Sequence, residues 1–284
     1  MKKFIIFLLA IFMFSPCLMA TNYALYFDGY DDFAEILNNN NSLTLQQMTI
    51  SLWAKPDAGS GIRPALYKNS NRASNYDNYD INVGDNGAVR FHVEESVGDA
   101  DYSVYSTTLA SSNEWIHISG VFTGTQLKIY INGDLENTYT SNTVNLYNGP
   151  ENLFLGTSRF SNHGGYAVGE PLGTSYKGLL DEVRVWNIVR TDEQIAQDYN
   201  DPIDPNIAGL VGYWNFDEDA NSQSIFDLTG NGNHGTLGSS NLSGGDDPIR
   251  VEALTPLSNV IPEPSTILLL VIACLYGLKF GSAP

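Results

Sequence analysis

Apolar and polar residues alternate over short runs along most of this chain. Successive side chains of a β-strand point to opposite faces, so a period of two is typical of strands buried on at least one face. Turn sequences that tolerate positive φ, such as Asp85-Asn86-Gly87 and Asn132-Gly133, separate some of the runs. The pattern predicts strands over residues 22–29, 48–55, 79–84, 88–93, 115–122, 126–131, 135–139, 153–156, 176–187 and 210–216.

A single short helix is predicted. Thr191 and Gln194 have the spacing of a capping box, with Thr191 as the N-cap and Gln194 at the third helical position. The helix should run to about Tyr199 and end before Pro202. Many short strands with one helix indicate an all-β fold, a sandwich or a barrel.

The strand predicted over residues 176–187 contains a carboxylate in an unexpected place. Strict alternation puts Asp181 on the same face as Val183 and Val185. Burying a bare carboxylate costs several kcal/mol, so Asp181 should be paired, bound to a cation, or solvated at the end of the strand. A structural metal ligand and a solvated residue are the two interpretations that remain open.

The charge and the cysteines limit the possible partners. The chain has 14 Lys+Arg against 32 Asp+Glu, a formal net charge of −18 at pH 7. This balance disfavours nucleic acid and anionic membrane surfaces as partners and suits divalent cations. Cys17 and Cys274 both lie in the terminal segments, so the body between them has neither a disulfide framework nor a cysteine metal site.

The N-terminal segment is typical of a signal peptide over residues 1–20. Lys2 and Lys3 precede an apolar run, and Ala20 offers a cleavage site. A retained anchor is the alternative, but about 11 apolar residues are too few to span a bilayer. After the signal peptide we expect a domain over residues 21–240, a linker over 241–260 and a second processing segment over 261–284.

The C-terminal segment resembles the PEP-CTERM sorting signal of Gram-negative bacteria. Pro262-Glu263-Pro264 precedes an apolar stretch that ends near Lys279. The resemblance implies processing by exosortase-type sorting machinery. The protein would be anchored transiently in the inner membrane and then lie at the cell surface or outside the cell. A single Lys279 stands where that family carries an arginine cluster, and a plain short membrane anchor is the alternative.

The body resembles the laminin-G-like, concanavalin A-like jelly roll of secreted bacterial proteins. Characteristic stretches are Thr49-Ile-Ser-Leu-Trp-Ala-Lys-Pro56 and Gly178-Leu-Leu-Asp-Glu-Val-Arg-Val-Trp-Asn187. Further matching segments lie at residues 24–33, 114–122, 127–133, 153–156, 210–216 and 227–235. The resemblance implies a concanavalin A-like jelly-roll sandwich of two antiparallel sheets, with the last strand beside the first.

The same resemblance implies a structural calcium ion. In related jelly rolls the ion lies where the first strand ends and a late strand passes, which here would pair Asp28 with Asp181. Backbone carbonyls near Gly29 and a carboxylate of Asp31 or Asp32 would complete the site. Ca²⁺ takes roughly six to eight oxygen ligands, so these residue types suit it. The alternative is that Asp28-Gly29 forms a plain β-turn.

Catalytic patterns known for this fold are not found in the sequence. Retaining β-glucanases of the fold need Glu-x-Asp-x-Glu on one strand face, whereas Asp181 and Glu182 are adjacent and alternate. The pair Glu94 and Glu95 fails for the same reason. No residues are therefore assigned a catalytic role, and we expect the protein not to be an enzyme.

The remaining candidate residues are aromatic or histidine. The four tryptophans lie inside strand patterns and should pack in the core. His92 and His117 should be partly buried and hydrogen-bonded, whereas His163 and His234 lie in loops. A glycan site would use tyrosines at the rim, whose rings pack on sugar CH groups. The candidates are Tyr67, Tyr76, Tyr79, Tyr102, Tyr105 and Tyr166, and the sequence does not choose among them.

These expectations favour an exported, non-catalytic protein that recognises extracellular polysaccharide or a cell-surface glycan and holds a structural calcium. The alternative is an enzyme, a divergent glycan hydrolase or lyase on the same fold. A structural spacer without a specific ligand is the third possibility.

Overall fold

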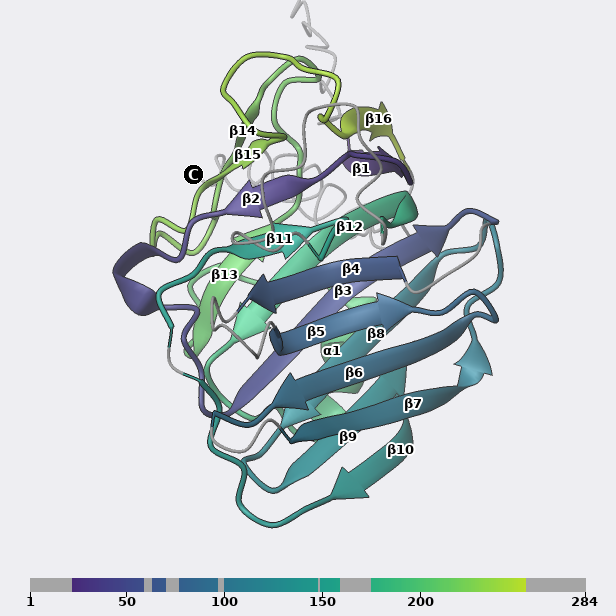
Figure 1. Cartoon of the computed structure of the whole chain (residues 1–284), viewed down its shortest axis with the longest axis vertical. Coiled ribbons are helices and arrows are strands. Elements are labelled where there is room, and N and C mark those ends of the chain that lie inside the picture. The colour runs from purple at the N-terminus through teal and green to yellow at the C-terminus, as the bar shows by residue number, and fades with distance from the viewer. Residues whose placement is uncertain are drawn as a thin grey trace, which may run out of the picture.

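The computed structural model describes residues 22–58, 63–69, 77–96, 100–147, 149–158 and 175–253. Within these ranges two eight-stranded antiparallel sheets pack face to face (Figure 1). Sheet A contains β1 (Tyr23–Asp28), β3 (Met48–Pro56), β8 (Ile116–Phe122), β9 (Gln126–Ile131), β10 (Asp134–Thr140), β12 (Lys177–Trp186), β13 (Leu210–Trp214) and β16 (Ile249–Glu252). Sheet B contains β2 (Ala34–Ile36), β4 (Arg63–Asn69), β5 (Asp77–Val83), β6 (Ala88–Glu94), β7 (Asp101–Leu109), β11 (Leu153–Leu155), β14 (Ser224–Ile225) and β15 (Gly235–Leu237).

The space between the sheets holds one large hydrophobic core. Alternate residues of both sheets supply it, for example Ile50 and Leu52 of β3 opposite Ile81 and Phe91 of β5 and β6. The strand order is β10-β9-β8-β3-β12-β1-β16 in sheet A, where β13 also pairs with β12, and β14-β15-β2-β11-β4-β5-β6-β7 in sheet B. The predicted fold class, an all-β sandwich of two antiparallel sheets with one helix, is confirmed.

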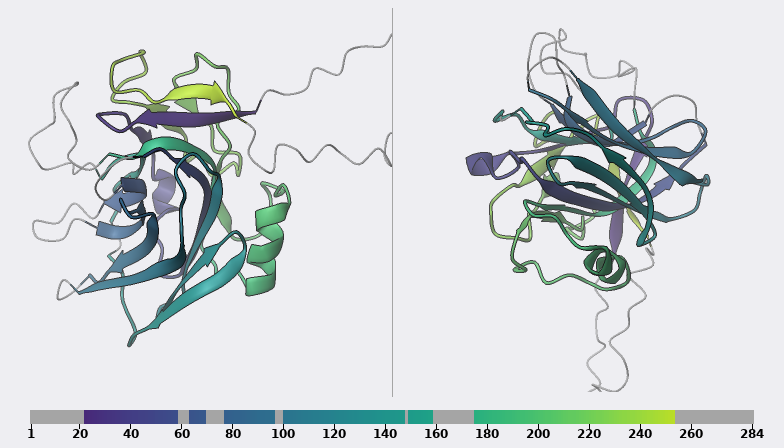
Figure 2. Two further views of the ribbon diagram at one scale, coloured as in Figure 1. Left: turned by 90° about the vertical axis from the view of Figure 1, so that its right-hand side faces the viewer. Right: turned by 90° about the horizontal axis from the view of Figure 1, so that it is seen from below.

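The helix packs on the outside of sheet A. Helix α1 (Asp192–Asn200) has the predicted capping box: Thr191 accepts from the Gln194 amide, and the Gln194 side chain accepts from the Thr191 amide. Ile195 of this helix packs with Val121 and Tyr130 on the outer side of the sheet. Figure 2 shows α1 against this sheet. Helix α1 thus covers part of the outer face of sheet A through an apolar contact. A 3₁₀ turn, η1 (Asn39–Asn41), is the other helical element of the described residues.

A β-bulge interrupts β12 and changes the predicted faces. Asp181 pairs with Trp53, but Arg184 pairs with Ser51, so β12 has one residue more than β3 between these pairs. Glu182 adopts a φ of 53° at this point. The bulge brings Val183 and Val185 into the core together with Leu180 and leaves Asp181 on the outer side. The prediction that Asp181 shares a face with Val183 and Val185 is wrong, because alternation holds only where the register is continuous.

The domain continues into the predicted linker. Residues 249–252 form β16, which pairs with β1, so the strand that closes sheet A falls within the range 241–260 that we expected to link two segments. A last strand beside the first is what the family resemblance implied. The short strands β2, β14 and β15 and the polar strands β4 and β7 were also not predicted, because their runs are too short or too hydrophilic to show the period.

The processing segments predicted at residues 1–20 and 261–284 lie outside the described residues. In the described part of the chain, no helix combines the length and the apolar character that crossing a bilayer requires.

Candidate functional site

Three aspartates gather at the end of β1 and in the turn that follows it. Asp28, Asp31 and Asp32 each offer a carboxylate oxygen, and these oxygens lie within 4.8 Å of one another. The Asp28 amide donates to Asp32 Oδ2 at 2.7 Å, and the Tyr30 amide donates to Asp28 Oδ1 at 2.7 Å, so the turn itself holds two of the carboxylates in place. Asp31 and Asp32 are both buried at 6 % exposure, whereas Asp28 is exposed.

The electrostatics of this group favour a bound cation. Burial, together with the carboxylates of Asp28, Asp31 and Asp247, raises the pKa of Asp32 from its ordinary 3.8 to about 7, although the Asp28 amide opposes the rise. Asp247 comes from the loop before β16, and burial and Asp246 raise its own pKa. The Asp246 carbonyl accepts from the Phe33 amide at 3.3 Å, which ties that loop to the turn. Several acids therefore interact around one small volume.

Of the three predicted metal ligands, the structure brings Asp28 and Asp32 together but not Asp181. Asp28 pairs with Lys177 across β1 and β12, and Leu25 pairs with Leu180. Asp181 therefore lies four residues beyond Lys177 along β12, or roughly 13 Å of strand. The predicted pairing of Asp28 with Asp181 is wrong. Asp28 lies on β1 and Asp181 on the neighbouring strand β12, but they do not lie opposite each other. The distant acid that does act on Asp32 is Asp247.

Asp181 belongs instead to a buried polar network on the outer side of sheet A. It is fully buried, its Oδ1 accepts from the Glu182 amide at 2.8 Å, and its Oδ2 accepts from Asn22 Nδ2 at 3.4 Å. Burial and the neighbouring Glu182 raise the pKa of Asp181 well above its ordinary value. Asp217, whose carboxyl accepts from the Tyr23 amide, has its pKa raised by burial to about 6. The interpretation of Asp181 as a solvated carboxylate is wrong, and no group of possible metal ligands among the described residues includes Asp181.

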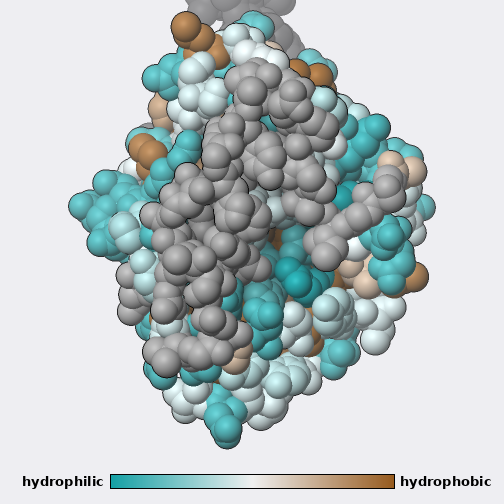
Figure 3. All heavy atoms as spheres, viewed as in Figure 1, coloured by the Kyte–Doolittle hydropathy of each residue, from teal (hydrophilic) through white to brown (hydrophobic). Residues whose placement is uncertain are grey.

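The outer face of sheet B is polar and largely buried. The register places Tyr67, Asp80, His92 and Ser103 in one row across β4 to β7. Tyr67, Asp80 and His92 are at most 2 % exposed. Asn78, Asn82, Arg90, Glu94, Asp101 and Tyr105 share this face in the flanking rows. Figure 3 views this side and shows hydrophilic residues gathered over β5 and β6. We call these residues the sheet B polar face.

Hydrogen bonds order the centre of the sheet B polar face. Arg90 Nη2 lies 3.1 and 3.2 Å from the two oxygens of Asp80, and Asn82 Nδ2 donates to Asp80 Oδ1 at 2.5 Å. Asn78 Nδ2 donates to the Tyr147 carbonyl at 2.7 Å. Within the described part of the chain, the buried Oδ1 atoms of Asn78 and Asn82 have no hydrogen-bond partner. Buried amide oxygens in this position are suited to accept hydrogen bonds from a ligand.

The tyrosines proposed from the sequence lie on both sides of sheet B, some on its outer polar face and some toward the core. Tyr67 and Tyr105 lie on the sheet B polar face, and Tyr105 is 51 % exposed. Tyr79 faces the core and donates to the Leu43 carbonyl, and Tyr102 packs against the core cluster. Tyr76 and Tyr166 lie outside the described residues.

The histidines and tryptophans largely follow their sequence patterns. His92 and His117 are 2 % and 1 % exposed, as predicted for strand residues, and His234 is exposed. The hydrogen bonds expected for His117 are not found, since neither ring nitrogen has a partner among the described residues; its ring packs on Trp53 and Tyr199 instead. His163 lies outside the described residues. Trp53, Trp186 and Trp214 are buried, and Trp115 is half-buried.

A second candidate site, here called the second hollow, lies at the β14 edge of sheet B. Its volume is about 240 Å³, and Phe226, His234, Leu37 and Glu35 are among its lining residues. Phe226 is 51 % exposed, and its ring meets the His234 ring edge-on at 5.6 Å. No periodic pattern in the sequence predicts this hollow, because its lining comes from the very short strands β2, β14 and β15 and from the loop residues beside them.

Comparison with known proteins identifies relatives of the fold. A family model described as the concanavalin A-like lectin/glucanases superfamily, for a laminin G-like family, matches residues 28–196. No protein of curated function has a sequence that matches this chain.

Solved structures resemble the described architecture. One is a candidate carbohydrate-binding protein from Bacteroides ovatus, with a TM-score of 0.57 and 20 % identity over 82 % of this chain and 62 % of that protein. This chain therefore spans less than two thirds of that protein's length. Another is the CBM40 module of the IT-sialidase from Ruminococcus gnavus, bound to α2,3 sialyllactose, with a TM-score of 0.50 and 17 % identity. That match covers 61 % of this chain and 95 % of the module. At these identities the likeness is one of fold.

Proposed function

This chain belongs to the concanavalin A-like lectin/glucanases superfamily, and from this premise we propose that it is a non-catalytic carbohydrate-recognition protein. The ligand would bind on the sheet B polar face. The solved structures that it resembles support this ligand class, since one is a candidate carbohydrate-binding protein and another is a CBM40 module bound to sialyllactose.

One observation on this chain carries the proposal: the two outer faces of the sandwich differ. The outer face of sheet A is closed by α1 through Val121, Tyr130 and Ile195. The outer face of sheet B instead carries charged and amide side chains on consecutive strands, with the exposed Tyr105 among them. Polar groups fixed on rigid strands and accompanied by an exposed tyrosine are what a sugar site requires, because they orient the hydroxyls while the ring packs on the CH groups.

The charge of the protein indicates which glycans should bind. The chain carries a formal charge of −18, and Arg90 is already paired with Asp80. A polysaccharide rich in carboxylates or sulfates would be repelled at low ionic strength. The proposed ligand is therefore a neutral polysaccharide whose hydroxyls donate to the Asn and Asp oxygens of the face.

A binding panel tests this proposal. We expect the protein to be retained on a neutral polysaccharide, and we expect Tyr105→Ala to weaken retention about fivefold or more, because one stacked ring contributes about 1 kcal/mol or more. Affinity electrophoresis over neutral and acidic polysaccharides measures this effect. Phe226→Ala is the matched control, since Phe226 is equally exposed but lies at the second hollow.

The outcomes of the panel are distinct. Loss of retention in Phe226→Ala but not in Tyr105→Ala would move the ligand to the second hollow. Absence of retention on every polysaccharide would favour a structural spacer and refute the recognition role.

Hydrolysis is the second candidate function, because the carboxylates of Glu94 and Asp101 lie in one group on the sheet B polar face. Retaining glycosidases place two carboxyl groups about 5 Å apart on either side of the bond that they cleave. The same panel decides the point: new reducing ends or unsaturated products, lost in Glu94→Gln, would replace the recognition role with an enzymatic one.

A structural calcium ion is part of the proposal, and the donor set after β1 fits it. Asp28, Asp31 and Asp32 would supply carboxylate oxygens, which a hard cation prefers, and bound calcium would neutralise acids that otherwise repel one another. Through Asp247 the ion would also stabilise the loop before β16 against the first strand.

We also propose that the protein is exported. Residues 1–20 would act as a signal peptide, and residues 261–284 would engage exosortase-type sorting machinery with transient anchoring in the inner membrane. Extracellular polysaccharide would then be the natural partner. Mass spectrometry of both termini of the exported protein tests this: intact residues at either end after export would refute the corresponding processing step.

A further inference from the structure

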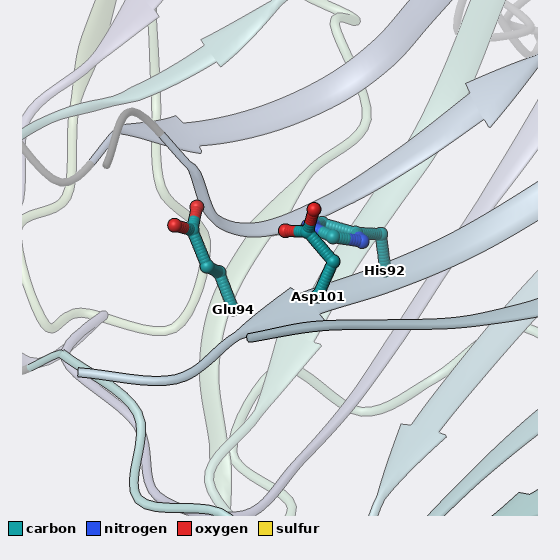
Figure 4. A group of neighbouring side chains, drawn as sticks. All are labelled: His92, Glu94 and Asp101. Carbon is teal, nitrogen blue, oxygen red and sulfur yellow. The ribbon is translucent and has the colours of Figure 1, made fainter. Parts of the chain in front are cut away.

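Three side chains on the sheet B polar face form a compact group of nitrogen and oxygen ligands. His92 and Glu94 are two residues apart on β6 and so lie on one face, and Asp101 pairs with Glu94 from β7. One atom of each, a ring nitrogen or a carboxylate oxygen, lies within 4.8 Å of the others. Figure 4 shows the two carboxylates and the imidazole gathered over the end of β6.

A hydrogen bond orients the buried imidazole. His92 Nδ1 lies 3.0 Å from Ser103 Oγ. When Nδ1 donates its proton to that hydroxyl, Nε2 presents its lone pair on the side of Asp101, as in metal sites whose histidine is oriented by a second hydrogen bond.

The spacing of the ligand atoms suits a small dication. His92 Nε2 lies 3.6 Å from Asp101 Oδ1. Two ligands bound to one Zn²⁺ at about 2.1 Å in tetrahedral geometry are about 3.4 Å apart, so only a small adjustment is needed.

The surroundings leave access to the group. The Asp101 side chain is 71 % exposed, whereas that of His92 is 3 % exposed, so one ligand borders solvent and another is rigidly buried. Arg90, the basic neighbour on the same strand, lies against Asp80, and this pairing reduces its repulsion of a metal. Such an arrangement combines a fixed ligand with an entry path.

We propose that His92, Glu94 and Asp101 bind a transition-metal dication of the Zn²⁺ type on the sheet B polar face. One nitrogen and two carboxylate ligands suit Zn²⁺ better than Ca²⁺, which distinguishes this site from the all-oxygen group of Asp28, Asp31 and Asp32. With three protein ligands, zinc keeps a position open for water or for a further oxygen ligand. The site does not depend on the glycan-binding role, which is tested separately by retention.

Metal titration of the full chain tests this site. With calcium present to occupy the group after β1, we expect Zn²⁺ to bind with a stoichiometry of one and to raise the Tm. Asp101→Asn and His92→Gln should each weaken binding about tenfold or more, since removal of a direct ligand costs at least as much as loss of a supporting hydrogen bond. Asp101→Asn alters an exposed residue, so it tests the ligand even where His92→Gln disturbs folding.

Two controls make the titration decisive. Asp28→Asn and His234→Gln should leave zinc affinity unchanged. Co²⁺ substitution should give visible absorption that requires His92. Equal zinc affinity in wild type, Asp101→Asn and His92→Gln, or no binding at micromolar zinc, would refute the site whatever the glycan panel shows.

Discussion

Replacement of Arg184 by methionine should lower the free energy of unfolding by about 3–5 kcal/mol, because it leaves a buried carboxylate without its cation. The Arg184 guanidinium is fully buried and pairs with Glu182, and its Nη1 donates to the Asp198 carbonyl of α1 at 2.9 Å. It also lies 5.1 Å from the centre of the Tyr213 ring, whose hydroxyl donates to Glu182 at 2.7 Å. Urea unfolding monitored by tryptophan fluorescence measures the loss.

A double mutant and a surface pair serve as controls for Arg184. Glu182→Gln combined with Arg184→Met removes both charges and should recover most of the lost stability. Lys128→Met breaks the exposed pair with Asp192 and should cost less than about 1 kcal/mol. A single Arg184→Met variant no less stable than Lys128→Met would show that the network at the β12 bulge contributes nothing to the fold.

The second large effect is a calcium-dependent response to pH that arises from Asp32. Its folded-state pKa of about 7 lies above the ordinary 3.8, so the folded protein binds this proton more tightly than the unfolded chain does. Without calcium, the stability contributed by this group is full at acidic pH and is lost as pH rises through about 7. In EGTA the Tm should fall by about 5 °C or more between pH 5 and pH 8.

Calcium should reverse that fall, because it binds the ionised carboxylates of the native state alone. Its stabilising effect should be largest at pH 8 and smallest at pH 5, where the proton competes for Asp32. Thermal unfolding across this pH range, with EGTA and with calcium, measures both effects.

Asp32→Asn is the decisive variant for the calcium proposal. It should raise the Tm in EGTA at pH 8 and abolish the response to calcium. Asp217→Asn is the matched control: it removes another carboxyl with a pKa raised to about 6, but it should leave the calcium response intact. The same pH profile in wild type and Asp32→Asn, or no calcium response at pH 8, would contradict the proposal.

The two candidate metal sites lie on different parts of the sandwich, and this separation has a functional consequence. The acids after β1 lie beside the loop that leads into β16 at the edge of sheet A, whereas His92, Glu94 and Asp101 lie on β6 and β7 of sheet B. Removal of calcium should therefore change stability before it changes ligand affinity. Removal of a bound transition metal should change ligand affinity before it changes stability.

Part of the candidate site could be read from the sequence. Asp28 and Asp32 are near neighbours in a turn, so the resemblance was enough to name them, and the structure brings them together with Asp31. Asp181 could not be placed, because its position depends on the pairing of β1 with β12, and an offset of a few residues separates two carboxylates completely. His92, Glu94 and Asp101 were not grouped either, since their proximity requires β6 and β7 to pair in one particular register.

The elements with a local signal could be predicted from the sequence: the strands with strict alternation, the hairpin turns and the capping box of α1. Period and capping depend only on neighbouring residues. The side of the sheet on which a residue lies, and the strands that pair, depend on the whole fold. A single extra residue at Glu182 reversed the face of Asp181, β16 closed a sheet from within an expected linker, and polar residues of β5 to β7 met on one face. Register between distant strands is set by packing of the whole core, so no local pattern contains it.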